Sequence, residues 1–347
     1  MSSTVLQQRR HQQILTDVVR TYIETGEPVS SRTVARRHSE PLSPATVRNV
    51  MADLEEEGYL YQPHTSAGRV PTASAYRFFV EQVAVQATAS PEDRQWIRRE
   101  LALAQTPEAV MERASHVLAE VSRGLGIFIS PPLASSVVEH LRFLLVPDHG
   151  VLVVLVTTGG FTRDKLIRPE RNFRQEDLDR ISTYLHQHYV GWTLEAIRAD
   201  LRAQVERDRE EYGRLANDAL MLCDPSVLGD GTERRVYVEG AAQIAASVQF
   251  TSQDQLRELL EAIEEKDRLI YLLSGCIEAP ESVHVELGLD KMSAAGKHLA
   301  LVSASYSSNA SAQGTLGILA PMRMHYERVI TAVAFMAQFF SETQTGN

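Results

Sequence analysis

Hydrophobic side chains recur at helical spacing in three successive segments of the first 60 residues. The first segment predicts an amphipathic helix over residues 5–25, which Gly26-Glu27-Pro28 ends. A short helix follows over residues 30–38. The third segment begins with Ser43 as a cap and Pro44 at the first helical position, and Gly58 lies just past its end. A short helix, a turn and a second helix behind a longer one predict a helix-turn-helix.

The stretch after the third helix has strand and turn composition. YLYQ (59–62) and RVP (69–71) predict two short strands, and HTSAG (64–68) predicts the turn between them. A β-hairpin attached to a helix-turn-helix is a wing. The segment QPHTSAGRVPT (62–72) contains almost no core residues, so we expect it to be exposed and to meet DNA.

The rest of the chain alternates between helical and β-rich patterns. Helices are predicted over residues 74–87 and 91–121, and two β-rich runs flank Asp148-His149-Gly150, a strong hairpin signal. After a helical region over 175–223 come a strand at RVYVEG, a charged helix, and strands at VHVELGL, LALVSASYS and GTLGILAP. Pro321 is expected to start a closing helix.

The helical region over 175–223 carries an apolar stripe amid dense charge. Such a stripe is typical of a helix that packs against its own chain, and equally of one that packs against a second copy. The spacing leaves both interpretations open. Our dimerisation candidates are Leu194, Ile197, Leu201, Val205, Tyr212 and Leu215.

Composition supports a soluble, cytoplasmic protein of two or three domains. The chain has 347 residues, of which 44% are hydrophobic and 23% charged. Its longest apolar run is far shorter than the roughly 20 residues that span a bilayer, and its N-terminus lacks the apolar segment of a secretory signal. We therefore expect no membrane contact. Cys223 and Cys276 are too far apart and too few for a disulfide framework or a zinc site.

The net charge of -10 is unevenly distributed along the chain. Residues 1–80 hold nine arginines against eight acids, so the remainder carries a charge of -11. A basic terminal module on an acidic body is typical of a regulator that contacts DNA at one end.

One long stretch carries a specific resemblance. LSPATVRNVMADLEEEGYLYQPHTSAGRVPT (42–72) closely resembles the HrcA family of bacterial heat-inducible transcription repressors, as do TGEPVSSRT (25–33), VYVEGAAQI and GTLGILAPMRMHYERVI. The chain departs from the family at Ala320-Pro321-Met322-Arg323-Met324, where a Gly-Pro-Thr-Arg-Met type is usual, and at LGLDK (287–291). These departures lie in the body and weaken any transfer of chaperonin or ligand contacts.

The resemblance implies an α+β multidomain protein. Its expected parts are a winged helix-turn-helix DNA-binding domain with a connecting helix (1–104), a discontinuous GAF-like α/β domain (105–174 and 276–347) and an inserted α+β dimerisation domain (175–275). It also implies a homodimeric repressor of heat-shock chaperone operons of the groE and dnaK type. Such a repressor binds an inverted-repeat operator in double-stranded DNA, and its activity is linked to the GroE chaperonin.

The first turns of a helix in the major groove lie nearest the base edges. Candidates for base reading are therefore Thr46, Arg48 and Asn49, of which Arg48 suits guanine and Asn49 suits adenine. Alternatively, Arg48 pairs with Asp53 or Glu55 on a solvated helix face. Candidates for phosphate or wing contacts are Arg32, Arg36, Arg37, Ser43, His64, Thr65, Ser66 and Arg69.

Other functions find less support in the sequence. It contains no Walker loop, no GxSxG and no HExxH, and Gly124-Leu125-Gly126 lacks the third glycine of a dinucleotide fingerprint. His186 and His188 point to different sides of a helix, so we expect no metal site. Because the enzyme motifs are missing as well, we expect no cofactor and no catalytic residue. The alternative is a winged-helix regulator whose GAF-like domain senses a small-molecule ligand.

Overall fold

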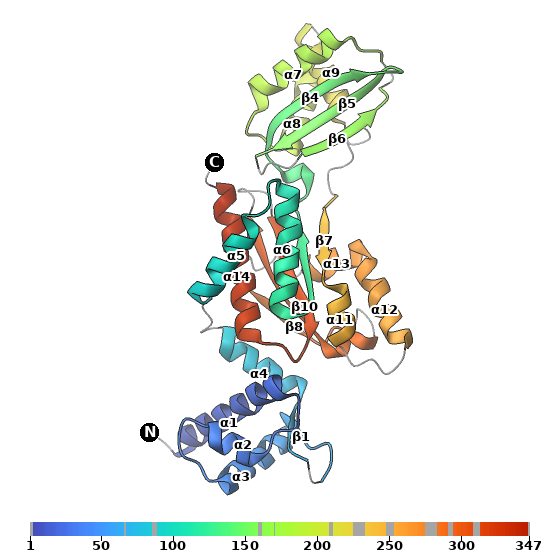
Figure 1. Ribbon diagram of the computed structural model, residues 1–347. Helices are drawn as coiled ribbons and strands as arrows, with labels where there is room; N and C mark the ends of the chain where they lie inside the picture. Colours follow the sequence, from blue (N-terminus) through green and yellow to red (C-terminus); the bar gives the residue numbers. More distant parts are fainter. Residues whose placement is uncertain are drawn as a thin grey trace.

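The computed structural model is a mixed α+β protein whose three parts lie in a row (Figure 1). The N-terminal part lies at one end, a five-stranded sheet with its helices in the centre, and a three-stranded sheet with its helices at the other end. The described residues are 3–65, 67–84, 89–158, 162–169, 171–207, 211–224, 233–247, 253–274, 283–290, 294–307 and 313–345. Within these ranges no helix is both long enough and apolar enough to cross a bilayer.

The N-terminal part contains three helices, a small hairpin and a fourth helix. They are α1 (Ser3–Thr25), α2 (Ser31–Arg37), α3 (Pro44–Glu56), β1 (Leu60–Tyr61), β2 (Val70–Pro71) and α4 (Ala73–Ala84). The predicted caps are confirmed, because the Ser30 and Ser43 hydroxyls accept hydrogen bonds from the amides of Thr33 and Thr46. Gly58 has the positive φ, 80°, that favours glycine after a helix.

The central part is an antiparallel sheet with helices on both faces. Its strand order is β7-β3-β10-β9-β8, and the strands are β3 (Leu125–Ile129), β7 (Val236–Glu239), β8 (His284–Leu287), β9 (Leu299–Ser307) and β10 (Gln313–Pro321). One face packs against α6 (Pro107–Ser122) and α14 (Tyr326–Thr345), with α5 (Pro91–Leu101) alongside. The other packs against α11 (Ala241–Ser247), α12 (Gln253–Glu264) and α13 (Lys266–Ser274).

Two predictions for this part are wrong in detail. The single helix expected over residues 91–121 is two helices, because Thr106 caps a new helix that begins at Pro107. Pro321 does not start the closing helix: it is the last residue of β10, paired with Leu299, and the helix begins at Tyr326 after a turn.

The outer part is a second antiparallel sheet with three helices on one face. The strands are β4 (Val138–Val146), β5 (Gly150–Thr157) and β6 (Thr162–Ile167), and the helices are α7 (Gln175–Tyr189), α8 (Leu194–Arg207) and α9 (Glu211–Cys223). A short 3-10 turn, Leu133–Ser135, precedes β4. A second one, Ala294–His298, precedes β9 of the central sheet. The predicted hairpin is confirmed, and Asp148 and His149 both have positive φ in its turn.

The expected domain boundaries need correction. The sequence places residues 138–174 in the discontinuous central domain, yet their strands share a core with α7–α9 and, within the described residues, pair with no central strand. Conversely, it places residues 236–274 in the insertion, but β7 pairs with β3 and α11–α13 pack on the central sheet. The separate unit that interrupts the central part therefore spans about residues 138–223.

The apolar stripe of this unit is internal core. Leu194, Ile197 and Leu201 are at most 1% exposed and pack with the buried face of the β4-β5-β6 sheet. Val205 and Leu215 are partly buried against the same core, while the Tyr212 side chain lies outside the described residues. Of the two interpretations left open, packing within one chain therefore applies, and these leucines and Ile197 are not free to meet a second copy.

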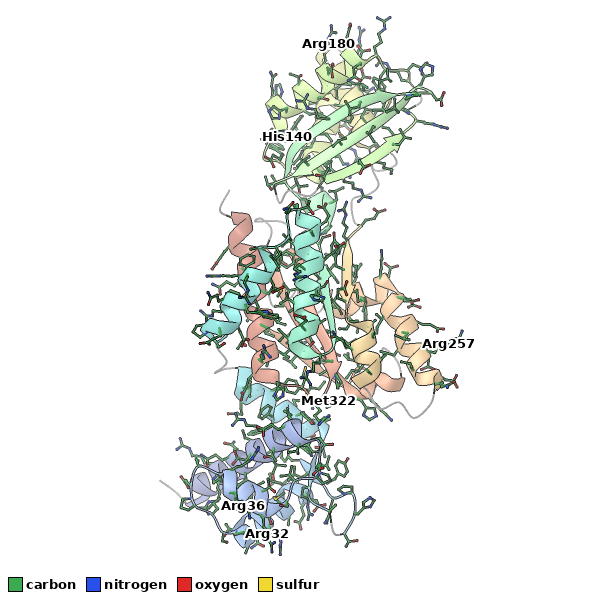
Figure 2. All side chains as sticks on the ribbon, viewed as in Figure 1. Arg32, Arg36, His140, Arg180, Arg257 and Met322 are labelled. Atoms are coloured by element: carbon green, nitrogen blue, oxygen red, sulfur yellow. The ribbon has the colours of Figure 1, made fainter. Side chains whose placement is uncertain are left out.

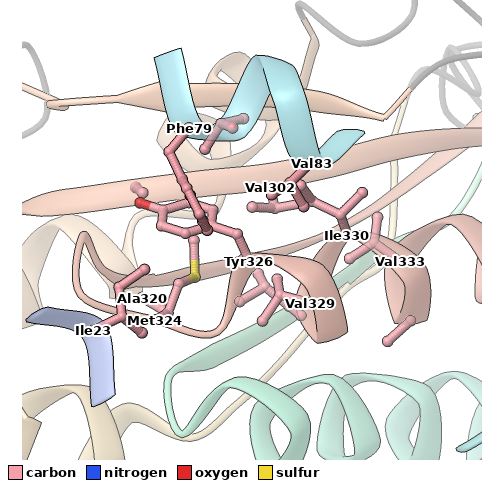
Figure 3. Close-up of a cluster of buried hydrophobic side chains, with 14 of the residues drawn as sticks. Ile23, Phe79, Val83, Val302, Ala320, Met324, Tyr326, Val329, Ile330 and Val333 are labelled. Atoms are coloured by element: carbon pink, nitrogen blue, oxygen red, sulfur yellow. The ribbon is translucent and has the colours of Figure 1, made fainter. Parts of the chain in front are cut away.

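One continuous core joins the N-terminal part to the central part. Tyr326, the first residue of α14, is 1% exposed and lies among side chains of α1, α4 and the central sheet (Figure 3). Ile23 of α1 and Phe79 of α4 approach it from the N-terminal side, and Tyr326 also donates a hydrogen bond of 2.7 Å to the Met322 carbonyl. Arg20 and Glu327 add an ion pair of 2.6 Å. The N-terminal part is thus fixed to the body.

Candidate nucleic-acid interface

Helix α3 presents two polar side chains side by side on its outer surface. Val47, Val50, Met51 and Leu54 are buried against α1 and α2, which turns Arg48 and Asn49 to solvent. Thr46 is only half-exposed, and its hydroxyl lies 2.9 Å from that of Ser43. Arg48 and Asn49 therefore occupy the first turns of a capped helix with their hydrogen-bonding groups exposed, whereas Thr46 is engaged in the cap.

Helix α2 adds exposed arginines at the same end of the molecule. Val34 is fully buried, which leaves Arg32 and Arg36 on the outer surface (Figure 2). Arg37 is also exposed, but its guanidinium is 2.5 Å from the Glu24 carboxylate on α1. Of the three predicted phosphate ligands on α2, Arg37 is thus already paired with an acid, whereas Arg32 and Arg36 form no ion pair within the described residues.

Two acids of α3 are paired with other groups. Asp53 lies 3.7 Å from the His11 imidazole, and Glu55 lies 2.8 Å from the Arg69 guanidinium. Among the residues that the structure describes, Arg48 makes no ion pair, and the same holds for Arg32 and Arg36. The alternative in which Arg48 pairs with Asp53 or Glu55 is therefore not what the structure contains.

The hairpin after α3 is held by polar contacts at both ends. The Gln62 side chain donates hydrogen bonds to the carbonyls of Thr65 (3.0 Å) and Ala67 (2.8 Å), which closes the loop. At the base, the Thr72 hydroxyl donates to the Gly58 and Tyr59 carbonyls, at 2.8 and 3.0 Å. The described residues on both sides of position 66 are therefore held by the chain's own groups.

The predicted wing residues differ in exposure. His64 and Thr65 are exposed at the tip, and Ser66 lies outside the described residues. Arg69 is the exception, because only 18% of its side chain is exposed and it pairs with Glu55. The structure thus brings Arg48, Asn49, Arg32 and Arg36 together at one end of the protein and withdraws Arg69 from it.

Sequence reasoning missed three residues of this region. The sequence predicts a strand at Gln62, and nothing in it shows that the Gln62 amide donates hydrogen bonds across the loop. Glu55 was considered only as a partner for Arg48. His38 is buried and hydrogen-bonded at 2.6 Å to Asp17, which ties α2 to α1 through residues 21 positions apart.

Neither a metal-binding cluster nor an activated cysteine thiol occurs in the part of the chain that the structure describes. The described residues contain no group of three or more His, Cys, Asp or Glu side chains that could hold a metal ion. Burial raises the pKa of the Cys223 thiol to about 12, which suits a packed side chain and not a nucleophile.

Comparisons with known proteins agree on one family. The family model described as HrcA protein C terminal domain matches residues 108–330. A "Heat-inducible transcription repressor HrcA" of Geobacter sulfurreducens is 35% identical, covering 97% of this chain and 98% of the relative. A protein of the same name from Syntrophobacter fumaroxidans is 32% identical over 96% of both chains.

A solved structure extends this similarity to the fold. It is described as a hypothetical protein at 2.2 Å resolution, and it superimposes with a TM-score of 0.63. The alignment covers 97% of this chain and 98% of the other, at 23% sequence identity. At that identity the likeness concerns the fold alone.

Proposed function

The chain belongs to the HrcA family of heat-inducible transcription repressors, and we propose that it binds its operator through residues 1–84, acting as a winged helix-turn-helix. The family is one of transcription repressors and not of enzymes. In this proposal α3 is the recognition helix and the β1-β2 hairpin is the wing. The main observation that supports the proposal is that Arg48 and Asn49 are exposed in the first turns of a capped helix. Arg48 has no acidic partner among the described residues.

Two kinds of contact follow from the side chains available. Arg48 can donate two hydrogen bonds to guanine and Asn49 can pair with adenine, each worth about 1 to 3 kcal/mol of discrimination. Arg32 and Arg36 suit phosphates, because they are exposed and unpaired within the described residues. Thr46 and Ser43 support the helix N-terminus, where backbone amides also favour a phosphate.

A single module of this size reads a short site, so we propose a homodimer on an inverted repeat. The buried stripe of α8 and α9 does not supply its interface, but the face of the β4-β5-β6 sheet turned away from α7–α9 offers one (Figure 1). Leu144, Leu152 and Leu166 form a row across the three strands there, and Leu144 and Leu166 are 46% and 58% exposed.

The neighbouring row of the same face carries opposite charges. Val154 pairs with Arg142 on one side and with Asp164 on the other. A second copy related by a twofold axis that runs parallel to β5 in the plane of this face would set each arginine against the partner copy's acid. This complementarity, next to an exposed leucine row, favours a second copy of the chain as the occupant.

The name shared by the relatives supports the regulatory context. We propose that the operators lie upstream of chaperone operons of the groE and dnaK type, and that activity depends on the GroE chaperonin. The central part, with helices on both faces of its sheet, is consistent with a GAF-like domain. The family departures at Ala320 and Met322 lie near the joint with α1, since Ala320 is buried in the shared core and Met322 packs against it.

Footprinting with the full-length protein upstream of the chaperonin genes tests the proposal. The expected result is a protected inverted repeat. Arg48→Ala should lower affinity by about 5- to 150-fold for each half-site that loses the contact, and relax preference at one base position in each half-site. Arg99→Ala removes an exposed arginine of α5 in the central part and should leave binding unchanged. Equal binding and equal base preference for wild type and Arg48→Ala would refute the assignment of α3.

A further inference from the structure

Arg69 occupies an unusual position for an arginine of a DNA-binding hairpin. Its guanidinium lies 2.8 Å from the Glu55 carboxylate, and only 18% of its side chain is exposed, against 33% for Glu55. Its Nε is fully buried and has no hydrogen-bond partner among the described residues. A guanidinium poised for phosphate would instead be exposed and free, as those of Arg32 and Arg36 are within the described residues.

The backbone of Arg69 is fixed as well. Its amide and carbonyl each form a hydrogen bond of 2.8 Å with Val29, in the turn between α1 and α2. The next residue back, Gly68, lies so close that an added Cβ would stand 2.4 Å from the Val29 carbonyl oxygen. The returning strand is thus held on one side by Val29 and on the other by Glu55 of α3.

We propose that Arg69 is a positioning residue, which ties the wing to the recognition helix through Glu55 and sets the angle at which the wing meets DNA. The proposal rests on the proposed function, because the angle of the hairpin matters only if the hairpin contacts DNA. The ion pair between Arg69 and Glu55, however, is present in the free protein. Gln62 complements it by closing the loop tip through the Thr65 and Ala67 carbonyls. Together these contacts hold the described residues of the hairpin in place before binding, which lowers the cost of ordering them on DNA.

The two roles for Arg69 predict opposite effects of neutralising Glu55. If Arg69 binds phosphate, Glu55→Gln frees the guanidinium and removes a negative charge, so binding tightens and its salt dependence steepens. If Arg69 positions the wing, the same change loosens the hairpin, so binding weakens although the protein becomes less acidic. The sign of the change therefore separates the roles.

The test measures operator affinity of the full-length protein over a range of salt concentrations. We expect Glu55→Gln to bind about two- to fivefold more weakly than wild type, the factor that loss of a partly exposed ion pair gives. Arg69→Gln should lose the same factor without a change in salt slope, and the double variant should lose no more than either single one. The matched control is Glu56→Gln, which removes an exposed charge on α3 that forms no ion pair among the described residues, and which should not weaken binding.

Hydrogen exchange without DNA gives a second measurement. Glu55→Gln, but not Glu56→Gln, should speed exchange over residues 67–72 by about two- to fivefold, because the Arg69 amide is protected by Val29. A Glu55→Gln protein that binds as tightly as the Glu56→Gln control overturns the positioning role, and so does unchanged exchange. If wild type itself fails to prefer operator DNA, the proposed function fails, and the exchange result alone decides whether Glu55 ties the wing.

Discussion

Arg36 and Arg37 are adjacent in the last turn of α2, and the structure predicts that they contribute unequally to DNA binding. Both are exposed, so replacing either by alanine removes the same charge from the same helix. They differ in one contact: Arg37 lies 2.5 Å from Glu24, whereas Arg36 has no ion pair within the described residues. Arg36 can therefore displace a full counterion from a phosphate, while Arg37 is already partly neutralised.

The expected magnitude follows from counterion release. Each phosphate contact contributes about 0.9 to the slope of log affinity against log salt, so one lost contact changes the ratio of wild-type to variant affinity about 3.5-fold between 50 and 200 mM salt. Arg36→Ala removes one contact from each copy, so we expect about a 12-fold change for a dimer on two half-sites. Exposed ion pairs contribute only about 0.2 to 1 kcal/mol, so Glu24 weakens but does not abolish the Arg37 contribution, and we expect less than about half the change for Arg37→Ala.

Fluorescence anisotropy with labelled operator duplex at four or five salt concentrations measures both slopes. A scrambled duplex is the control, because phosphate contacts should change both duplexes alike. Glu24→Gln provides the reciprocal check: it should release Arg37 and make the slope steeper than that of wild type. Equal slopes for Arg36→Ala and Arg37→Ala would show that the Glu24 contact does not persist on DNA, and would refute the reasoning.

Three further predictions concern the body. Tyr326→Ala should lower the free energy of unfolding by about 3 to 5 kcal/mol, because the buried ring is lost. Tyr326→Phe should lower it by only about 1 kcal/mol, because only the hydrogen bond to the Met322 carbonyl is lost. Calorimetry that finds the two variants equally stable would contradict the burial of the ring. Leu166→Asp should convert a dimer to monomers in sedimentation with little change in monomer stability, and an unchanged sedimentation rate would rule out the β4-β5-β6 face. Burial raises the pKa of Tyr76 and Tyr326 above the ordinary 10.0, so as pH rises these tyrosines ionise in the unfolded chain before they ionise in the folded one. The melting temperature should therefore fall as pH rises above 10. A melting temperature that does not change with pH in this range would contradict their burial.

The part of the fold that could be predicted from sequence is the part that local signals determine. Ser43, Pro44 and Gly58 mark the two ends of α3 through groups within a few residues, and the turn at Asp148 joins strands that are neighbours in the chain. Exposure of Arg48 and Asn49 follows from helical spacing once the apolar face of α3 is known. For these elements the chain's short-range chemistry leaves few alternatives.

The contacts that separate one arginine from another could not be predicted in this way. Arg69 meets Glu55 across a turn, and Arg37 meets Glu24 across two helices, so both pairs depend on tertiary packing. The same holds for the boundaries of the outer part: β7 pairs with β3 although more than 100 residues separate them, and no pattern within either strand records its partner. A stripe of leucines likewise has the same spacing whether its own chain or a second copy covers it.

The two joints of the molecule differ in kind, and this difference bears on how a repressor dimer would fit its operator. The N-terminal part shares one buried core with the central part around Tyr326, so its orientation cannot change without exposing that core. The outer and central parts have separate cores, and Arg235 links them through polar contacts to Glu108 on α6 and the Thr162 carbonyl on β6. Breaking such contacts costs far less than opening a core. If the outer part forms the dimer, adjustment of the distance between the two recognition helices is therefore expected at Arg235 and not at Tyr326.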